Sequence, residues 1–311
     1  MRLPWISRRQ SPRGATRRKR SAPLRVRRLE RRRVLDAAVT DLVFAPADVD
    51  GSTAVHDSNE GVEVTVTADA TGSSPLFYDW TLTQGADVVA QSNNPAFQFT
   101  PLDDANYSVT LEVTDSTESV ASRSESLIVH NVRPVLTVAP DQMVDEGSLL
   151  DLSAVGAPPL GLFIDDGLLD THTATVDWGD GSTIESPTIF AAAGSGALGG
   201  THTYTNDGVY EVIVSVTDDD GGNDTQSFFV TVGNVAPTAT LSNDGPVDEG
   251  ASATVSFSGQ FDPSIDDTAA GFRYAYDLDN NGTFDVGDGT YAGSGTTDTQ
   301  MISAALLADG P

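Results

Sequence analysis

The chain repeats itself at a spacing of 103 residues, and this repeat limits what it can fold into. Three short motifs recur at that offset. They are Asn131-Val132-Arg133-Pro134 with Asn234-Val235-Ala236-Pro237, Val144-Asp145-Glu146-Gly147 with Val247-Asp248-Glu249-Gly250, and Val113-Thr114-Asp115 with Val216-Thr217-Asp218. Residues 107–147 aligned on residues 210–250 share 16 identities in 41 positions, whereas unrelated sequences would share about three. The chain is therefore a duplication of a unit slightly longer than 100 residues.

Apolar and polar residues alternate with a period of two, which predicts strands with one buried and one solvated face. The clearest segments are residues 107–113 and 210–216, and residues 62–67 and 253–257 alternate likewise. Helix formers are sparse, β-branched residues are abundant and Gly-Asp-Asn turns are frequent, so we expect no helix in the body of the chain. The uncharged stretch 186–206, rich in glycine and alanine, is expected to be a loop.

A unit of this length with many short strands is the size of an immunoglobulin-like β-sandwich. Trp80 and Trp178 stand where such a sandwich buries one aromatic side chain between its sheets, and Tyr107 and Tyr210 follow later in each copy. We expect these residues to be core rather than ligand platforms. The predicted fold class is all-β: tandem immunoglobulin-like sandwiches, the third truncated, preceded by a disordered basic segment. The expected divisions are 1–36, 37–132, 133–235 and 236–311.

Each copy opens near a Glu-Gly pair and then carries a strand-like segment with a central aspartate. The pairs are Glu60-Gly61, Glu146-Gly147 and Glu249-Gly250, and the segments are Tyr78-Asp79-Trp80, Val176-Asp177-Trp178 and Tyr276-Asp277-Leu278. The third copy stops at Pro311, before the closing strands that the second copy has. A sandwich without those strands would expose an unpaired edge. We therefore expect the 311 residues to be the front of a longer polypeptide.

The second copy carries a specific signature, Trp178-Gly179-Asp180-Gly181, followed by Thr201-His202-Thr203-Tyr204 and Gly208-Val209-Tyr210. Over about residues 135–236 it resembles the PKD (polycystic kidney disease) repeat, whose hallmark is the Trp-Gly-Asp-Gly turn. The first copy resembles a diverged member, with Thr81-Leu82-Thr83 in place of Gly-Asp-Gly. The resemblance implies an extracellular spacer, an adhesion module or an accessory domain beside a secreted hydrolase.

The charge is split sharply along the chain. Residues 1–33 hold 14 of the 17 basic residues and one acid, whereas the remainder holds three arginines and 44 acids. A body this acidic and without lysine would repel phosphates, so no nucleic acid or anionic membrane is expected as its partner. It suits an extracellular or saline setting, or one rich in divalent cations. Cysteine is absent, and no apolar run approaches the roughly 18 residues that span a bilayer.

The basic head ends in Leu29-Glu30-Arg31-Arg32-Arg33-Val34-Leu35. This segment resembles the LEPR-XLL element at the N-terminus of many large planctomycete surface proteins, with Arg31 in place of the family's proline. The resemblance implies export or sorting to the cell surface, although the apolar stretch of an ordinary signal peptide is missing. Two alternatives stay open: a disordered cationic arm that touches nucleic acid, or a partly untranslated segment before a later start.

Residues 277–288, the Asp277 loop, have the spacing of an EF-hand-type calcium loop, with oxygen-bearing residues at positions 1, 3, 5 and 9 and Gly282 at position 6. The expected ligands of this Ca²⁺ site are Asp277, Asp279, Asn281, Thr283, Asp285 and Asp288. The flank 272–276 is strand-like, not helical, and position 12 is aspartate instead of glutamate. The competing interpretation is an Asn-Gly hairpin turn with solvated acids.

Two further acidic runs, Asp218-Asp219-Asp220 and Asp165-Asp166, are candidates for calcium held between neighbouring domains, although such runs are more often solvated turns. The four histidines show no metal-ligand spacing, and His202 is expected to be structural. Neither a Gly-x-Ser-x-Gly elbow nor a His-Glu-x-x-His motif is present, and a phosphate loop would need a lysine that the body lacks. No catalytic residue is therefore expected.

The leading hypothesis is a non-catalytic extracellular or cell-surface stalk or adhesion segment of a larger exported protein. The alternative is a carbohydrate- or protein-binding accessory region of a secreted hydrolase whose catalytic domain lies beyond residue 311. An exposed aromatic strip on one sheet face would favour the alternative. In both cases the expected partner is an extracellular protein or polysaccharide.

Overall fold

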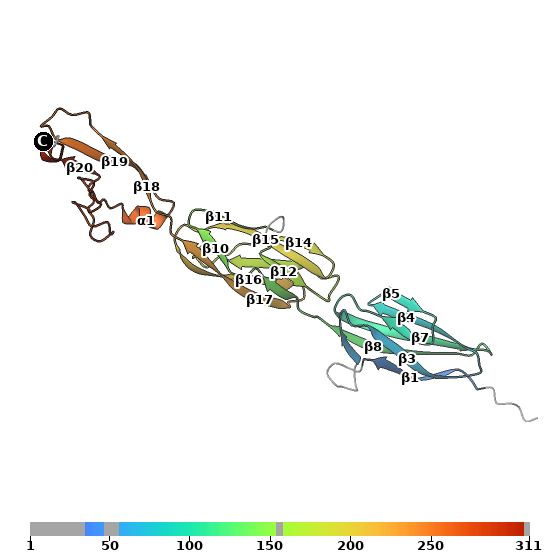
Figure 1. Cartoon of the computed structure of the whole chain (residues 1–311). Coiled ribbons are helices and arrows are strands. Elements are labelled where there is room, and N and C mark those ends of the chain that lie inside the picture. The colour runs from blue at the N-terminus through green and yellow to red at the C-terminus, as the bar shows by residue number, and fades with distance from the viewer. Residues whose placement is uncertain (1–34, 47–55, 154–157, 308–311) are drawn as a thin grey trace, which may run out of the picture.

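The computed structural model describes residues 35–46, 56–153 and 158–307, and its strands form sandwiches that follow one another along the chain (Figure 1). The fold is nearly all β, as the alternating pattern predicted. Residues 1–34 lie outside the described residues, so the expected disordered head and its sorting element are not described here.

The first sandwich is built from β1 to β8. One sheet has the order β1-β3-β6 and the other β2-β8-β7-β4-β5. Its strands are β1 (Ala38–Ala45), β2 (His56–Asn59), β3 (Val64–Thr71), β4 (Leu76–Gln84), β5 (Asp87–Ser92), β6 (Phe97–Phe99), β7 (Ala105–Asp115) and β8 (Val120–His130). The short strand β2 pairs parallel to β8, and the other strand pairs are antiparallel.

The second sandwich, β9 to β17, repeats this plan. Its sheets have the orders β10-β17-β16-β13 and β11-β15-β12-β9, with β14 also paired to β15. The strands are β9 (Val135–Val138), β10 (Gln142–Asp145), β11 (Leu149–Leu152), β12 (Gly161–Ile164), β13 (His172–Asp177), β14 (Thr188–Ala192), β15 (Ser195–Thr203), β16 (Gly208–Asp218) and β17 (Asn223–Gly233). As in the first sandwich, the short strand before the Glu-Gly pair, β10, is parallel to the last strand.

The predicted core aromatics occupy equivalent places in the two sandwiches. Trp80 and Trp178 are both fully buried. The hydroxyl of Tyr107 donates to the backbone oxygen of Asp103, and that of Tyr210 to the backbone oxygen of Asn206, each at 3.0 Å and four residues upstream. This is the tyrosine-corner arrangement of immunoglobulin-like sandwiches. The interpretation of these residues as core is confirmed.

The prediction of a loop over residues 186–206 is wrong, because strands β14 and β15 form there. The glycines that suggested a loop instead make room for large neighbours. A Cβ at Gly196 would lie 2.4 Å from the Phe163 ring, and one at Gly200 would lie 3.3 Å from the Trp178 ring. Glycine therefore sits in this strand because two aromatic rings pack against its backbone.

The third segment holds a sheet of order β18-β19-β20, from β18 (Thr238–Asn243), β19 (Ala253–Phe261) and β20 (Thr299–Ile302). The expectation of no helix is wrong for α1 (Ile265–Ala270) and α2 (Ala304–Leu307). Ser264 is the N-cap of helix α1, and its side chain accepts a hydrogen bond from Asp267 N. The strand expected at residues 272–276 is reduced to two isolated bridges, Tyr274 with Gly295 and Tyr276 with Val286.

Candidate metal centres

The Glu60-Gly61 pair is held at the end of the first sandwich. Glu60 N donates to the backbone oxygen of His130 at 3.2 Å, and Gly61 N to that of Pro101 at 2.9 Å. Gly61 has φ +71°, and a Cβ there would lie 2.7 Å from the Cβ of Asp166 in the second sandwich. Glycine is therefore required at this position both by the left-handed φ angle and by the close approach of the next domain. This turn places the Glu60 side chain at the first junction, between the two sandwiches.

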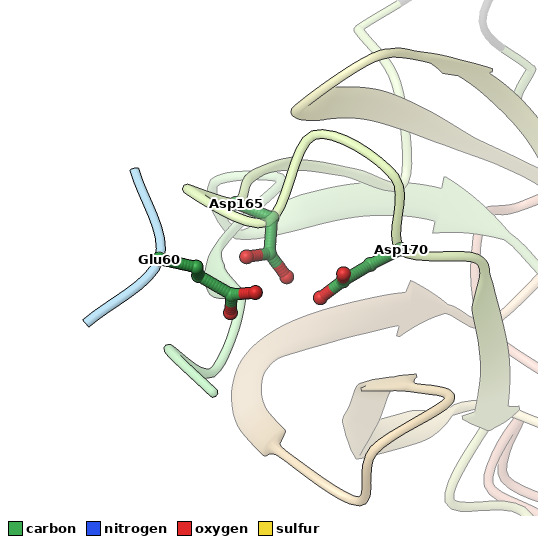
Figure 2. A group of neighbouring side chains, drawn as sticks. All are labelled: Glu60, Asp165 and Asp170. Carbon is green, nitrogen blue, oxygen red and sulfur yellow. The ribbon is translucent and has the colours of Figure 1, made fainter. Parts of the chain in front are cut away.

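Two aspartates of the second sandwich lie opposite Glu60 in the segment between β12 and β13. Figure 2 shows the carboxylates of Glu60, Asp165 and Asp170 pointing toward one another. One oxygen from each of the three lies within 4.8 Å of the others. A second group, Asp103, Asp170 and Asp220, shares Asp170 with the first. The first junction thus gathers carboxylates from both sandwiches.

The electrostatics of this junction are unfavourable for carboxylates without a counter-charge. Burial raises the pKa of Glu60 to about 7, with the nearby Asp170 and Asp165 adding to the rise. Burial likewise raises the pKa of Asp170 to about 6, and Asp165 and Asp103 contribute. Desolvation and like charges both penalise the ionised form.

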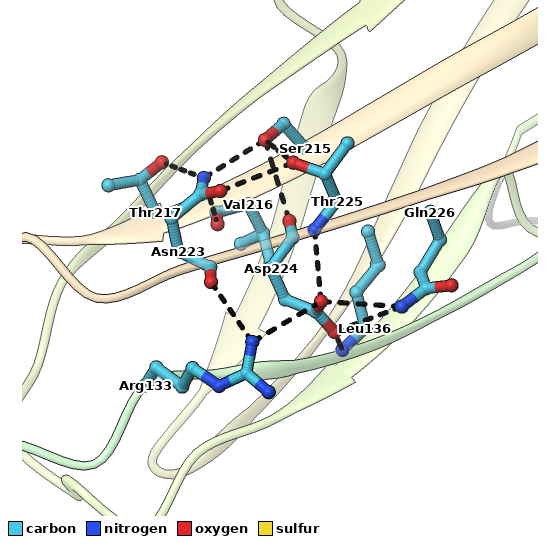
Figure 3. Close-up of polar contacts among 9 residues, drawn as sticks. All are labelled: Arg133, Leu136, Ser215, Val216, Thr217, Asn223, Asp224, Thr225 and Gln226. Atoms are coloured by element: carbon cyan, nitrogen blue, oxygen red, sulfur yellow. Dashed lines mark hydrogen bonds and ion pairs between the residues drawn. The ribbon is translucent and has the colours of Figure 1, made fainter.

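The linker between the sandwiches is bonded to both of them. Val132 N donates to Glu60 Oε1 at 2.6 Å, and Asn131 Nδ2 donates to Asp218 Oδ2 at 3.1 Å. Figure 3 shows the continuation into the second sandwich, where Arg133 lies 3.7 Å from an oxygen of Asp224. The other oxygen of Asp224 accepts from Leu136 N at 2.8 Å, at the start of β9. The linker is therefore fixed by hydrogen bonds rather than left as a free tether.

The Asp277 loop brings three of its six predicted ligands together. Carboxylate oxygens of Asp277, Asp279 and Asp285 lie within 4.8 Å of one another. Most of the loop is exposed, and backbone groups already bond its carboxylates: Asp277 accepts from Asn281 N at 3.1 Å and Gly282 N at 2.8 Å. These bonds hold the pKa of Asp277 below its usual value.

Of the other three predicted ligands, Asp288 lies outside this group, whereas the side chains of Asn281 and Thr283 are hydrogen-bonded within the loop. Asp288 accepts hydrogen bonds from Thr290 N at 2.9 Å and Thr290 Oγ1 at 2.6 Å, and it is outside the group of three. The side-chain oxygen of Asn281 accepts from the backbone N and the hydroxyl of Thr283. Calcium binding at this loop stays a prediction.

Calcium binding by the Asp277 loop should change the tyrosine signal of the third segment. Tyr276 immediately precedes Asp277, and its hydroxyl donates to the backbone oxygen of Thr297 at 2.9 Å. We expect millimolar Ca²⁺ to shift this signal in the near-ultraviolet circular dichroism spectrum, and Asp277→Ala to remove the shift. Asp248→Ala, which changes an exposed acid outside the loop, is the control. An unchanged spectrum at millimolar Ca²⁺ would rule out binding at this loop.

The remaining candidates from the sequence have structural contacts. Asp218 is buried, and its Oδ1 accepts from Asp220 N and Gly222 N at 3.0 and 2.7 Å. His202 stacks on Trp178 with ring centroids 4.8 Å apart and bonds Asp180 Oδ2 at 2.8 Å, so its structural contacts match the role expected of it. His172 bonds Asp165 Oδ2 at 2.9 Å. Since an ionised carboxylate only accepts, this bond orients Asp165 through a donated imidazole N–H.

Sequence reasoning named Asp165 and Asp220 but missed Glu60, Asp103 and Asp170 as possible ligands. A signal was present, because each complete copy opens with Glu-Gly. The pair Asp165 and Asp170 also recurs 97 residues later as Asp262 and Asp267. Neither pattern resembles a metal motif within one segment, because the ligands come from different domains.

These paired sheets, with one buried tryptophan and one tyrosine corner in each sandwich, define a tandem array of immunoglobulin-like β-sandwiches. A family model described as "PKD domain" matches residues 131–232. The match falls on the second sandwich and confirms the resemblance seen in its Trp-Gly-Asp-Gly turn. No curated protein matches the chain.

Several solved structures are similar to the chain at low identity. They include "Anomalous substructure of Titin-A168169" (11% identity, 58% of this chain and 95% of that chain, TM-score 0.32). The Clostridium thermocellum CbhA fibronectin(III)-like modules match at 15% identity over 62% of this chain and 94% of that chain, with a TM-score of 0.25. A chain of Dpr2 Ig1-Ig2 in complex with DIP-Theta Ig1-Ig3 matches at 14% identity over 64% of this chain and 65% of that chain, with a TM-score of 0.28. This chain thus spans slightly less than two thirds of that chain, and these likenesses add nothing beyond the sandwich fold.

The helices of the described residues are α1 and α2, and neither has the length or the apolar character needed to cross a bilayer.

Proposed function

We propose that the chain is a non-catalytic stalk or adhesion segment of a larger exported protein, exposed at the cell surface or secreted. The observation that supports it is the tandem arrangement itself: two complete sandwiches and a third segment follow one another with linkers of a few residues (Figure 1). Sandwiches of this kind are typically non-catalytic and extracellular. An array of such units serves to hold whatever it carries at a distance from its attachment point.

The acidic surface supports the same proposal. The chain after residue 33 contains 44 acidic residues and three arginines, so the array repels other polyanions and stays soluble in an ionic medium. The division at 132/133 and 235/236 belongs to this proposal, as does the sorting role of the head around Leu29–Leu35. Under this proposal the partner would be an extracellular protein or polysaccharide.

The accessory role beside a hydrolase is less well supported by the surface. Polysaccharide-binding sandwiches need aromatic side chains lined up on one face. Here both described tryptophans are core, and each sheet of the first two sandwiches exposes at most one phenylalanine among its described residues: Phe77 on β4, Phe190 on β14 and Phe229 on β17. Isolated exposed apolar residues are ordinary on protein surfaces. The described sheets of the first two sandwiches therefore offer this role no aromatic strip.

The surface location is tested on intact cells of the organism that makes the protein. An antibody against the sandwiches should label intact cells, and external proteinase should remove the epitope without lysis. A cytoplasmic protein of the same cells serves as the control for integrity. Labelling that appears only after permeabilisation, together with absence from the medium, would contradict the proposal. Retention of the chain on insoluble polysaccharide would instead favour the accessory role.

A further inference from the structure

The contacts of the Glu60-Gly61 pair recur at the second junction, between the second sandwich and the third segment. Glu146 N donates to the backbone oxygen of Gly233 at 3.0 Å, and Gly147 N to that of Tyr204 at 2.8 Å. Gly147 has φ +73°, close to the +71° of Gly61. Glu146 Oε1 accepts from Val235 N of the linker at 2.8 Å, as Glu60 Oε1 accepts from Val132 N. Glu60 and Glu146 therefore make the same backbone hydrogen bonds, accept the same bond from the linker and occupy equivalent positions in their domains.

The acids contributed by the following domain also recur. Asp262 and Asp267 stand 97 residues after Asp165 and Asp170, and one oxygen from each lies within 4.8 Å of the others and of Glu146. Asp262 Oδ1 accepts from Ser264 N at 2.8 Å, matching the bond from Gly167 N to Asp165 Oδ1 at 3.0 Å. A Cβ at Gly147 would lie 2.5 Å from Pro263 Cβ, so the next domain again approaches the glycine closely. One arrangement of three carboxylates thus occurs at two successive junctions.

The same oxygen is left without a partner at both junctions. Glu60 is 0% exposed and Glu146 1% exposed, and the Oε2 atom of each is buried with no hydrogen bond among the described residues. Both carboxylate oxygens of Asp170 are also buried and unbonded there. Figure 2 shows that the Glu60 carboxylate points at the aspartates. A buried carboxylate without a partner is costly, and several together repel one another, unless a cation lies between them.

We propose that each junction is a calcium site, with Glu60, Asp165 and Asp170 as ligands at the first and Glu146, Asp262 and Asp267 at the second. The donors within each group are all carboxylate oxygens, which suits a hard cation. Calcium accepts 6 to 8 oxygens in flexible geometry, including backbone carbonyls and water, whereas Mg²⁺ demands a near-octahedral set. At the first junction Asp103 and Asp220 supply further carboxylates through the group that shares Asp170.

The ligands come from two domains, so an ion at the junction would connect them. Glu60 belongs to the first sandwich and the two aspartates to the second, and His172 orients Asp165 from behind. Calcium would offset the burial and the like-charge repulsion that together raise the pKa of Glu60 and Asp170, and it would fix the angle between the sandwiches. The array would then be stiff with calcium and more flexible without it. This site goes beyond the proposed function and does not depend on it, because a titration of the purified chain measures the affinity of the site whatever the location of the protein in the cell.

The test is a calcium titration of the full chain by isothermal titration calorimetry, after dialysis against chelator and in about 0.15 M NaCl to screen non-specific binding. We expect two equivalents from the junctions, with dissociation constants of about 10⁻⁴ to 10⁻³ M or tighter. A further equivalent would come from the Asp277 loop if that loop binds.

Glu60→Gln should remove one equivalent or weaken it at least tenfold, and Glu146→Gln should do the same to the other. Glutamine keeps a side-chain oxygen for the Val132 N–H, so the fold is retained. The matched control is Glu249→Gln, which changes the third Glu-Gly pair, where the glutamate is exposed. Asp170→Asn provides a second variant that breaks no hydrogen bond of the described structure, because neither oxygen has a partner.

Small-angle X-ray scattering supplies the second readout. Calcium should narrow the range of conformations of the parent chain, seen as a change in its pair-distance distribution. The pair-distance distribution of the double variant Glu60→Gln, Glu146→Gln should not change when calcium is added. If Glu60→Gln and Asp170→Asn bind calcium with the stoichiometry and affinity of the parent chain, the site at the first junction does not exist, and the same result for Glu146→Gln excludes the site at the second. The surface-labelling experiment is independent of this result, so failure of one proposal leaves the other standing.

Discussion

Replacing Trp178 with alanine should lower the free energy of unfolding of the second sandwich by about 3 to 5 kcal/mol, the usual loss for a buried aromatic residue. Trp178 is 0% exposed and lies in the core with Leu160, Leu198 and Tyr204. Its backbone oxygen accepts from the Tyr204 hydroxyl at 3.1 Å, and its indole N–H donates to Glu185 Oε2 at 3.1 Å. The substitution therefore leaves a large cavity and removes the indole's bond to Glu185.

The first sandwich should keep its stability in the same variant. Its core is a separate cluster around Trp80, and no residue is shared between the two clusters. Denaturant unfolding, followed by Trp80 fluorescence in a Trp5→Phe background and by far-ultraviolet circular dichroism, separates the two transitions. Trp80→Ala should give the reciprocal result, and Trp178→Phe a smaller loss. Equal displacement of both transitions by Trp178→Ala would show that the sandwiches unfold as one unit.

The core was predictable because its signals are local. Alternation along residues 107–113 and 210–216 shows which side of each strand is buried, and the repeat shows that Trp80 and Trp178 are equivalent. Glycine misled the interpretation of β15, since Gly196 and Gly200 indicate a loop until their aromatic neighbours are known. The identity of those neighbours depends on sheet packing, which no local pattern encodes.

The two kinds of candidate metal site also differ in how far the sequence predicts them, because one is local and the other depends on packing between domains. Asp277, Asp279 and Asp285 come together as their spacing predicted, because one short loop carries them. Glu60 and Asp170 come together only because the second sandwich docks against the end of the first. The Glu-Gly pair was visible as a repeat marker, but its burial depends on Gly61 meeting Asp166 of the next domain. Contacts of this kind follow from the arrangement of domains rather than from a motif.

Gly179→Ala should destabilise the second sandwich much more than Gly181→Ala, although both glycines belong to the Trp-Gly-Asp-Gly turn. The backbone demands are alike, with φ +79° at Gly179 and +84° at Gly181. A left-handed conformation costs a residue with a Cβ about 1 to 2 kcal/mol, so both variants should lose this amount. The difference between the two lies in what the added methyl group meets.

At Gly179 the added Cβ would lie 2.4 Å from the backbone oxygen of Glu211, whereas at Gly181 nothing lies within 4 Å. Glu211 lies within β16, whose backbone pairs with β17 along nearly its whole length, so this part of the strand cannot move aside cheaply. Overpacking of this kind costs about 1 to 3 kcal/mol more. Gly179→Ala should therefore lose about 2 to 5 kcal/mol in all, from the sum of the two contributions.

Denaturant unfolding of the two variants beside the parent chain measures this difference directly, with the Trp80 transition of the first sandwich as the internal reference. Equal losses for Gly179→Ala and Gly181→Ala would mean that the turn requires glycine for its dihedral angles alone. A larger loss at Gly179 would mean that the first glycine is required by the passage of the chain against β16. In the first copy β4 continues through Thr81-Leu82-Thr83 into a hairpin with β5, so the turn and its left-handed φ are missing there and no glycine stands at the equivalent place.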